Sequence, residues 1–265
     1  MTALEILIIG QVTSSILMAL AWLFCKRLKN ASYVDVLWAY GVGVMGIVFI
    51  CSVQGDLSRK KLIIGLLSLW SLRLGTHLYQ RCRKGREDSR YKYFRQSWGE
   101  RADNLFFWFF QKQAFWVVLF AAPFLIVGKN SEPMGILDFI GISVWMVGFI
   151  GGGLADRQLA NFKNEPKRKQ GDVCTKGLWK WSRHPNYFFE WVLWCSYPFI
   201  GWQAPNGEWL LLLPILLMIF LLKVTGIPHV EARKLEDSGR QYREYMARTS
   251  AFIPWFPRKI KKKSI

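Results

Sequence analysis

Apolar residues along this chain are gathered into seven stretches, each close to the length of a membrane-crossing helix. A transmembrane helix needs about 20 mostly apolar residues, and the third stretch is the weakest because Arg73 and His77 interrupt it. No internal repeat or low-complexity linker divides the chain. The pattern predicts an all-α fold, a polytopic membrane helix bundle with seven transmembrane helices in a single domain over residues 1–265. The expected spans are 4–25, 33–53, 62–80, 105–127, 135–155, 187–204 and 208–227.

Basic residues between these stretches predict the orientation. If the N-terminus lies outside, the segments 26–32, 81–104, 156–186 and 223–265 are cytoplasmic and contain 30 of the 36 Lys and Arg residues. Because cytoplasmic loops carry the excess of Lys and Arg, we expect the N-terminus outside and the C-terminus cytoplasmic. The basic tail 258–263 is typical of a segment attracted to anionic membrane lipids.

Composition excludes several other classes of protein. The chain is 52% hydrophobic, with 14 Trp, 19 Phe and a net charge of +18, and its mean hydropathy is +0.14. A disordered basic chain would not contain so many aromatic residues. Nucleic acid is a poor partner, because the charge is spread over loops tied to the bilayer. Five scattered cysteines without a Cys-x-x-Cys pair predict neither a disulfide framework nor a metal site.

Asp35 is a first candidate for function, because ionisable groups inside apolar spans are costly and usually functional. It lies in the segment 33–40, and Asp35 and Trp38 share one face of the expected helix. The alternative role of Asp35 is a hydrogen bond that serves only packing.

The densest polar signal surrounds the third cytoplasmic loop. Asp156 ends the fifth span, and Arg183-His184-Pro185-Asn186-Tyr187 begins the next helix, with Glu190 one turn later. Free backbone N–H groups at such a helix start favour an anion, and Lys163 and Arg183 add cations that can meet phosphates. Asp156, Asn186 and Glu190 offer the donors and acceptors that ribose hydroxyls or a carboxamide need. The pattern therefore favours a polar, anionic cofactor over a merely solvated loop.

Two further segments on the same side could meet that anion. One is the basic run that begins at Arg81, and the other is the tail segment 229–245. The expected loops that face the cofactor are therefore 81–104, 156–186 and 228–257. They contribute the candidates Arg81, His229, Arg233, Tyr242 and Tyr245.

The chain resembles the steroid 5α-reductase family, in particular its bacterial membrane homologues. The resemblance rests on Gly-Arg-Glu-Asp-Ser-Arg-Tyr at 85–91, on the run 156–163, on the segment 177–190, and on Tyr245…Arg248-Thr-Ser…Phe252-Ile253-Pro254. It covers most of residues 33–257. It implies an NADPH-dependent oxidoreductase of a bacterial cytoplasmic membrane that reduces a C=C bond conjugated to a ketone, as in Δ4-3-oxosteroids.

The resemblance also implies which residues bind NADPH. Asp156, Asn186 and Glu190 would hold the nicotinamide side and the riboses. The residues expected at the phosphates and the adenine are Lys163, Arg81, Arg183, His184, Arg233 and Tyr242. Tyr187, His229 and Tyr245 complete the predicted cofactor-binding set.

Animal members of the family carry a Gln-Glu pair that holds the substrate carbonyl, and this chain lacks that pair. Asp35 is the expected substitute, with His77 or Tyr79 as its partner and Tyr33, Tyr40 or Tyr79 as a second donor. A neutral acid in an apolar pocket can stabilise the substrate oxygen as it gains charge. Trp38 and Tyr40 would line a slot for a flat, steroid-like enone that enters from the lipid.

The main rival is a membrane methyltransferase that uses S-adenosylmethionine. The Arg183–Tyr187 turn and Tyr242-Arg-Glu-Tyr245 fit both classes, but the tail has Glu231-Ala232 instead of paired glutamates. A bisphosphate cofactor also explains the basic loops better than a cationic sulfonium does. A transporter or sterol-binding protein would need charged residues through the middle of the membrane, whereas the polar groups gather at one face.

Overall fold

A computed structural model gives the architecture of the chain, and it describes residues 1–83, 87–167, 169, 171–224 and 226–258. Residues 84–86 of the predicted 81–104 loop, residues 168 and 170 of the third loop, and the tail lysines at 259–263 lie outside the described residues. The described part is helical, and its only β-bridge joins Ser182 to Ser250. The chain divides into two compact units: residues 1–134 with 201–207, and residues 135–200 with 208–265.

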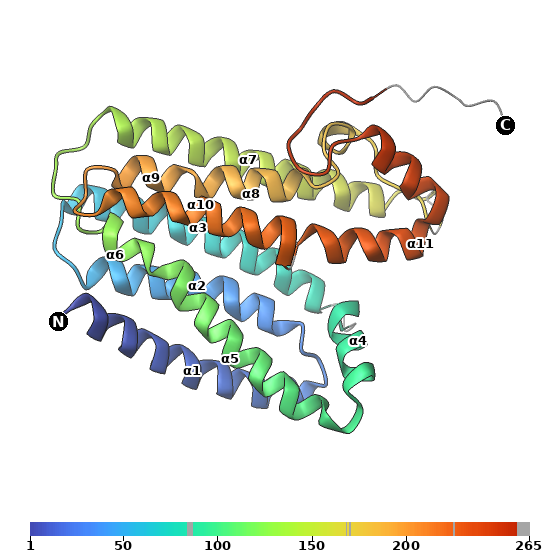
Figure 1. The fold of residues 1–265 in the computed structure, drawn as a ribbon, viewed down its shortest axis with the longest axis horizontal. Coiled ribbons are helices and arrows are strands. Elements are labelled where there is room, and N and C mark those ends of the chain that lie inside the picture. The colour runs from blue at the N-terminus through green and yellow to red at the C-terminus, as the bar shows by residue number, and fades with distance from the viewer. Residues whose placement is uncertain (84–86, 168, 170, 225, 259–265) are drawn as a thin grey trace. The chain divides into compact units, whose positions relative to one another are not determined.

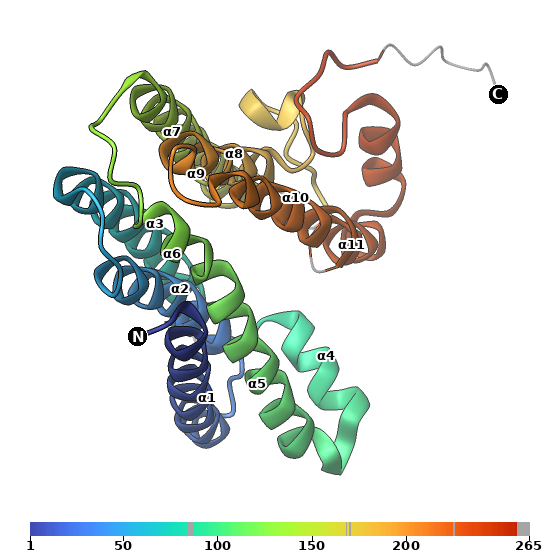
Figure 2. The same cartoon turned by 60° about the vertical axis from the view of Figure 1, so that its left-hand side comes forward.

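Unit 1 is a group of long apolar helices. Its helices are α1 (Ala3–Leu28), α2 (Tyr33–Cys51), α3 (Leu57–Arg83), α4 (Ser89–Trp98), a 3-10 turn η1 (Gly99–Arg101), α5 (Ala102–Ala121) and α6 (Pro123–Val127). Helix α2 packs against α1, α3 and α5, and α4 lies beside the first turns of α5 (Figures 1 and 2). The fully buried side chains of unit 1 include Phe49, Leu67, Trp70 and Phe110.

Local chemistry explains several helix ends in unit 1. Thr2 accepts from the Glu5 backbone N–H at 3.2 Å while the Glu5 carboxylate accepts from Thr2 N, which forms a capping box for α1. Pro123 separates α5 from α6, because proline has no N–H to continue the helical ladder. Asp88 caps α4 by accepting from Arg90 N at 3.0 Å.

Unit 2 contains α7 (Ile136–Lys163), η2 (Gly177–Lys180), α8 (Pro185–Trp194), α9 (Ser196–Gly201), η3 (Gly207–Leu211), α10 (Leu212–Ile219), a π turn η4 (Phe220–Val224) and α11 (Ile227–Arg248). Helix α8 packs along α7 and against α10 (Figures 1 and 2). Helix α11 bends at Gly239, whose φ of 47° lies in a region that glycine adopts without strain.

Six helical stretches are long and apolar enough to cross a membrane: Ala3–Leu28, Tyr33–Cys51, Leu57–Arg83, Ser89–Val127, Ile136–Lys163 and Gly207–Arg248. The chain is therefore an all-α, multi-pass membrane protein with about six candidate spans among the described residues. The stretch expected at 187–204 is two shorter helices, α8 and α9, and Pro198 cannot donate to the carbonyl of Trp194 across that break.

The last candidate stretch has two parts with different chemistry. Its apolar residues end at Val224, and α11 then carries nine Asp, Glu, Lys and Arg residues. Charges at that density do not enter a bilayer core. We therefore place α11 outside the membrane-spanning part.

Candidate functional site

The polar residues predicted around the third loop meet where α7 ends and α8 begins. Asn186 Nδ2 donates to Asp156 Oδ1 at 3.3 Å, and both side chains are half-buried. Pro185 starts α8, which places Asn186 in its first turn. The two helices approach closely because Gly148 and Gly151 of α7 leave room for Leu193 and Phe189 of α8.

Glu190 lies one helical turn beyond Asn186 and therefore on the same side of α8. Its Oε1 accepts a hydrogen bond from Trp194 Nε1 at 3.0 Å. The predicted trio of Asp156, Asn186 and Glu190 thus forms a polar strip on α7 and α8, and this grouping agrees with the sequence interpretation.

Arg183, immediately before α8, is the centre of a buried ion pair. Its side chain is only 9% exposed, and its Nε donates to Glu231 Oε1 of α11 at 2.7 Å. Its Nη1 donates to the carbonyls of Thr249 at 2.6 Å and Met246 at 3.1 Å. Because these bonds join the start of α8 to both ends of α11, we call the group of Arg183, His184, Glu231 and Tyr242 the Arg183 clamp.

The other members of the clamp converge on the same carboxylate. His184 Nε2 lies 3.2 Å from Glu231 Oε1, and the Tyr242 hydroxyl donates to it at 3.5 Å. Burial alone would raise the pKa of Glu231, but the hydrogen bonds from His184 and Arg183 and the charge of Arg183 lower it from 4.5 to about 2. Burial raises the pKa of Tyr242, and the charge of Glu231 raises it further. The clamp is therefore held by a carboxylate that stays ionised at neutral pH.

Residues 177–184 are fastened on two sides. On the α7 side, Trp179 Nε1 donates to Ala155 O at 2.9 Å, and Leu178 N donates to Gln158 Oε1 at 2.8 Å. On the α11 side, the Tyr245 hydroxyl donates to the carbonyls of Trp179 and Ser182. These bonds position Arg183 and Asn186 on a rigid support.

The remaining cofactor candidates have more varied positions. Tyr187 stacks on His184 with ring centroids 5.5 Å apart, and His229 Nε2 lies 3.1 Å from the Val224 carbonyl. Lys163 and Arg233 are exposed. Arg81 belongs to unit 1, where its Nη2 donates to Asp88 Oδ2 at 2.9 Å.

Asp35 of unit 1 accepts hydrogen bonds that the sequence interpretation did not assign to it. Arg90 Nη2 donates to its Oδ2 at 2.8 Å, and the Tyr91 hydroxyl donates to its Oδ1 at 2.7 Å. Arg90 Nε also donates to Asp88 at 3.1 Å, so the network ties α4 to the start of α2. Arg90 and Tyr91 lie within the motif 85–91, and that motif was the available signal for them. Asp35 is thus an acceptor here, and its role as a neutral donor stays a prediction.

The other catalytic and substrate candidates lie in aromatic contacts of unit 1. The rings of Tyr33 and Tyr79 are 6.4 Å apart. Trp38 meets Phe120 edge-on at 5.7 Å, and the Tyr40 hydroxyl lies 3.3 Å from Thr76 Oγ1. His77 is half-buried on α3. The hydrogen bonds that Asp35 accepts come from Arg90 and Tyr91, so its catalytic pairing with His77 or Tyr79 also stays a prediction.

Glu231 is the site residue that sequence reasoning missed, since it was noted only because it lacks a second glutamate beside it. The signal that could have found it is Arg183, because a buried arginine requires a carboxylate or several carbonyls as partners. Among the described residues, no group of three His, Cys, Asp or Glu side chains could hold a metal ion.

Fold and site together define a multi-pass, all-α membrane protein whose polar residues gather at the ends of its helices. Comparison with known proteins identifies the family: the model of the family described as "Protein of unknown function (DUF1295)" matches residues 21–249. The chain belongs to this family. It is also similar to an uncharacterized protein of Schizosaccharomyces pombe, with 28% identity over 274 residues that cover 93% of this chain and 79% of the relative. No solved structure matches the chain significantly.

Proposed function

We propose that this protein is an NADPH-dependent membrane reductase that transfers a hydride to the C=C bond of an enone, as steroid 5α-reductases do with Δ4-3-oxosteroids. The observation that carries the proposal is the strip of Asp156, Asn186 and Glu190, with Asn186 bonded to Asp156 at 3.3 Å. The strip stands next to the Arg183 clamp and at the ends of helices that are otherwise apolar.

The chemistry of these side chains fits a nicotinamide dinucleotide. The Asn186 amide can both donate and accept, as a carboxamide partner must, and the carboxylates of Asp156 and Glu190 can accept from ribose hydroxyls. The exposed cations Lys163 and Arg233 can meet phosphate oxygens. Arg183 and His184 are bonded to Glu231, so their main contribution is to hold the start of α8 in place.

The reaction needs a dry environment and a donor to the substrate oxygen. NADPH, when bound, supplies the hydride. The chain supplies aromatic and apolar span residues that admit a flat hydrophobic substrate from the lipid. Asp35, Tyr33, His77 and Tyr79 remain the proposed donors, with Trp38 and Tyr40 as substrate contacts. A carbonyl oxygen that gains charge is stabilised most by donors already aimed at it.

The proposal includes seven spans, an external N-terminus and a bacterial cytoplasmic membrane. The consecutive helices α8 and α9 would then supply the seventh crossing. The excess of Lys and Arg in the segments 81–104 and 156–186 supports a cytoplasmic position for the nucleotide site, which is also where reduced nicotinamide nucleotides are available.

Nucleotide binding to the purified protein in detergent tests the proposal. Titration with NADPH, followed by its fluorescence, should give saturable binding to the wild-type protein. Asn186→Ala should weaken that binding by about tenfold or more, because one hydrogen-bonded group at a binding site contributes about 1–3 kcal/mol. Asn161→Ala is the matched control, since Asn161 is an exposed asparagine on α7.

Two outcomes would refute the reductase. One is an absence of NADPH binding by the wild-type protein, and the other is equal affinity of the Asn186→Ala and Asn161→Ala variants. Saturable binding of S-adenosylmethionine without NADPH binding would instead favour the methyltransferase.

A further inference from the structure

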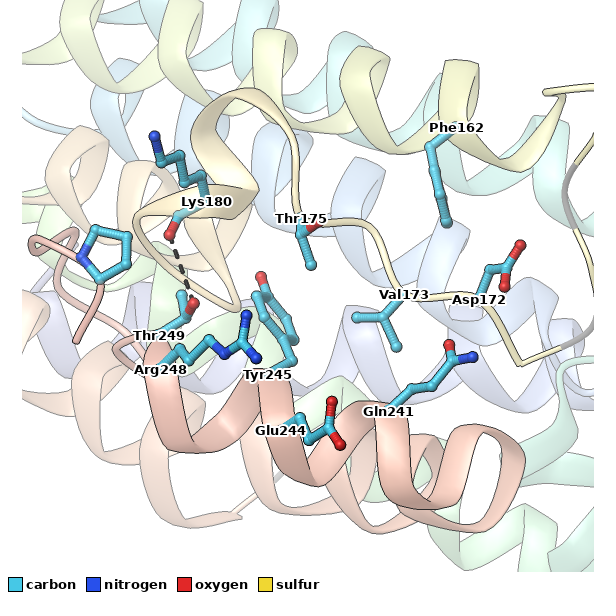
Figure 3. Close-up of a pocket in the computed structure, with 11 residues that line it drawn as sticks. Phe162, Asp172, Val173, Thr175, Lys180, Gln241, Glu244, Tyr245, Arg248 and Thr249 are labelled. Atoms are coloured by element: carbon cyan, nitrogen blue, oxygen red, sulfur yellow. Dashed lines mark hydrogen bonds between the residues drawn. The ribbon is translucent and has the colours of Figure 1, made fainter. Parts of the chain in front are cut away.

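A cavity of about 450 Å³ lies in unit 2, between the loop that follows α7 and the second half of α11 (Figure 3). Its volume lies within the range of about 300–1,000 Å³ that small-molecule sites occupy. One wall comes from the loop residues Asp172, Val173 and Thr175, and the facing wall comes from α11. The lining residues of α11 and the segment after it are Gln241, Glu244, Tyr245, Arg248, Thr249 and Pro257.

The charged side chains that line the cavity differ in their hydrogen-bond partners. Asp172 accepts from the Lys169 backbone N–H at 2.7 Å, and Glu244 accepts from Arg240 Nε at 3.0 Å. Among the described residues, no carboxylate or carbonyl partner engages the Arg248 guanidinium. The cavity lining therefore holds one cation, Arg248, and one carboxylate, Asp172, whose charges no ion pair among the described residues neutralises; Arg248 is the one available to an anion.

Lys180 also lines the cavity, but its charge lies elsewhere. Its ammonium lies 5.6 Å from the ring centroid of Trp181, and Figure 3 shows it directed away from α11. Its backbone carbonyl faces α11 and accepts from Thr249 Oγ1 at 3.5 Å. Arg248 and Lys180 thus carry the same charge near the same cavity, while only Arg248 extends from the α11 wall that faces the loop.

The cavity also offers aromatic surface and a fixed frame. Phe162, next to last in α7, and Tyr245 both line it. The Tyr245 ring is held because its hydroxyl donates to the carbonyls of Trp179 and Ser182. A flat heterocycle can pack against such rings, and the hydroxyl of Thr175 and the amide of Gln241 are polar groups that can meet ring nitrogens or sugar hydroxyls.

The cavity is joined directly to the Arg183 clamp. Thr249 lines the cavity, and its carbonyl accepts from Arg183. The cavity lies on the polar side of the clamp, since its walls are the end of α7, the following loop and the charged helix α11. A dinucleotide that reaches a hydrophobic substrate with its nicotinamide must place its other, more polar end in surroundings of this kind.

We propose that this cavity binds the adenosine end of the dinucleotide and that Arg248 binds the 2′-phosphate, so that Arg248 selects NADPH over NADH. The inference rests on the proposed reductase function and deepens it. The aromatic walls take the adenine ring, and the guanidinium pairs with a phosphate that NADH lacks. A charge-assisted pair of this kind discriminates strongly, because only one of the two nucleotides presents the anion.

The test compares the dissociation constants of NADPH and NADH for the full-length protein in detergent. In Arg248→Ala, the affinity for NADPH should fall by about tenfold or more, as expected for a lost hydrogen bond to a charged group, while the affinity for NADH changes less than about twofold. Arg243→Ala, which removes the same charge from an exposed position of α11 that does not line the cavity, should leave both affinities unchanged. Competition by 2′,5′-ADP should weaken in Arg248→Ala in parallel with NADPH, whereas 5′-AMP should compete equally in both proteins.

Any result other than these would contradict the assignment of Arg248 to the 2′-phosphate. Equal losses for NADPH and NADH would place Arg248 at a group that both nucleotides share. An equal effect of Arg243→Ala would show that Arg248 acts only through its general positive charge. Arg248→Gln provides a second variant that keeps polarity if the alanine variant folds poorly. Failure of the reductase proposal looks different, because the wild-type protein would then bind neither nucleotide.

Discussion

The close contact between α7 and α8 gives the sharpest prediction about what builds the site. A Cβ added at Gly148 would lie 2.5 Å from Leu193 N and 2.7 Å from Leu193 Cα. Ordinary contacts of a Cβ begin at 3.4 Å, so the backbones would have to separate by roughly 0.9 Å. Backbone atoms cannot rotate away as a side chain does, and forced overpacking of this kind costs about 1–3 kcal/mol. Gly148→Ala should therefore lower the free energy of unfolding by that amount relative to a Gly→Ala change at an uncrowded position of the same helix.

The same helix contains its own control. Gly153 lies five residues later on α7, and a Cβ there would meet nothing within 4 Å. Both substitutions exchange glycine for alanine inside one helix, so their effects on helix propensity cancel. For a chain of this size, the difference corresponds to a Tm about 2–12 °C lower for Gly148→Ala than for Gly153→Ala. Thermal unfolding in detergent measures it.

The prediction extends to the site, because α7 carries Asp156 and α8 carries Asn186. Separation of the helices should lengthen their hydrogen bond and weaken NADPH binding in Gly148→Ala but not in Gly153→Ala. Identical Tm values for the two variants would refute the reasoning, since they would show that α7 and α8 are not in backbone contact at Gly148.

Four further predictions concern three polar groups that are held in hydrogen-bond networks. Glu231→Ala should destabilise the protein by about 3–5 kcal/mol, because it removes the carboxylate partner of a buried arginine. The control Glu244→Ala loses only an exposed ion pair and should cost less than about 0.5 kcal/mol. Chemical denaturation compares the two variants. Since the pKa of Glu231 is lowered to about 2, its contribution is complete above about pH 4.5 and is lost as the pH falls towards 2, so the acid branch of the Tm–pH curve should flatten in Glu231→Ala. Arg59 is 1% exposed and donates to the carbonyls of residues 130, 132 and 133. Arg59→Met should therefore lower the Tm strongly. A Tm equal to that of Lys61→Met, which changes an exposed cation of the same helix, would contradict this. Tyr91→Phe removes one donor from Asp35 and should cost about 1–3 kcal/mol, so an unchanged Tm would mean that the Asp35 network does not hold α4.

The long helices could be predicted from the sequence, because a run of about 20 apolar residues has few alternatives to a helix. The expected spans 4–25, 33–53 and 62–80 correspond to α1, α2 and α3, although α3 begins five residues earlier. The run 187–204 was expected as one helix, yet it forms α8 and α9. Pro198 is the physical reason for the break between these helices. A count of apolar residues takes no account of a missing backbone N–H.

Polar helices were harder to see. The segments 81–104 and 228–257 were interpreted as loops, but they contain α4 and most of α11. Both helices are rich in charged residues, so neither stands out as the apolar run that reveals a membrane-crossing helix. Specific polar bonds hold them instead, such as the bond from Arg90 to Asp35 and the bond from Arg183 to Glu231.

The sequence also could not separate the cations that hold the structure from those that are available to a ligand. Arg183 was among the residues expected at the phosphates, whereas Arg248 was noted only as part of the segment 245–254. Folding gives Arg183 a carboxylate 48 residues away and two backbone carbonyls, whereas Arg248 receives no such partner among the described residues. Contacts between residues so far apart in the sequence produce no periodic pattern, so only the folded structure reveals them. The two arginines should therefore respond differently to substitution: Arg183→Ala should lower both the Tm and the affinity for NADPH, whereas Arg248→Ala should lower the affinity alone. Measurement of Tm and dissociation constant on the same two preparations distinguishes these roles, and a comparable fall in Tm for both variants would show that the distinction drawn from their partners is wrong.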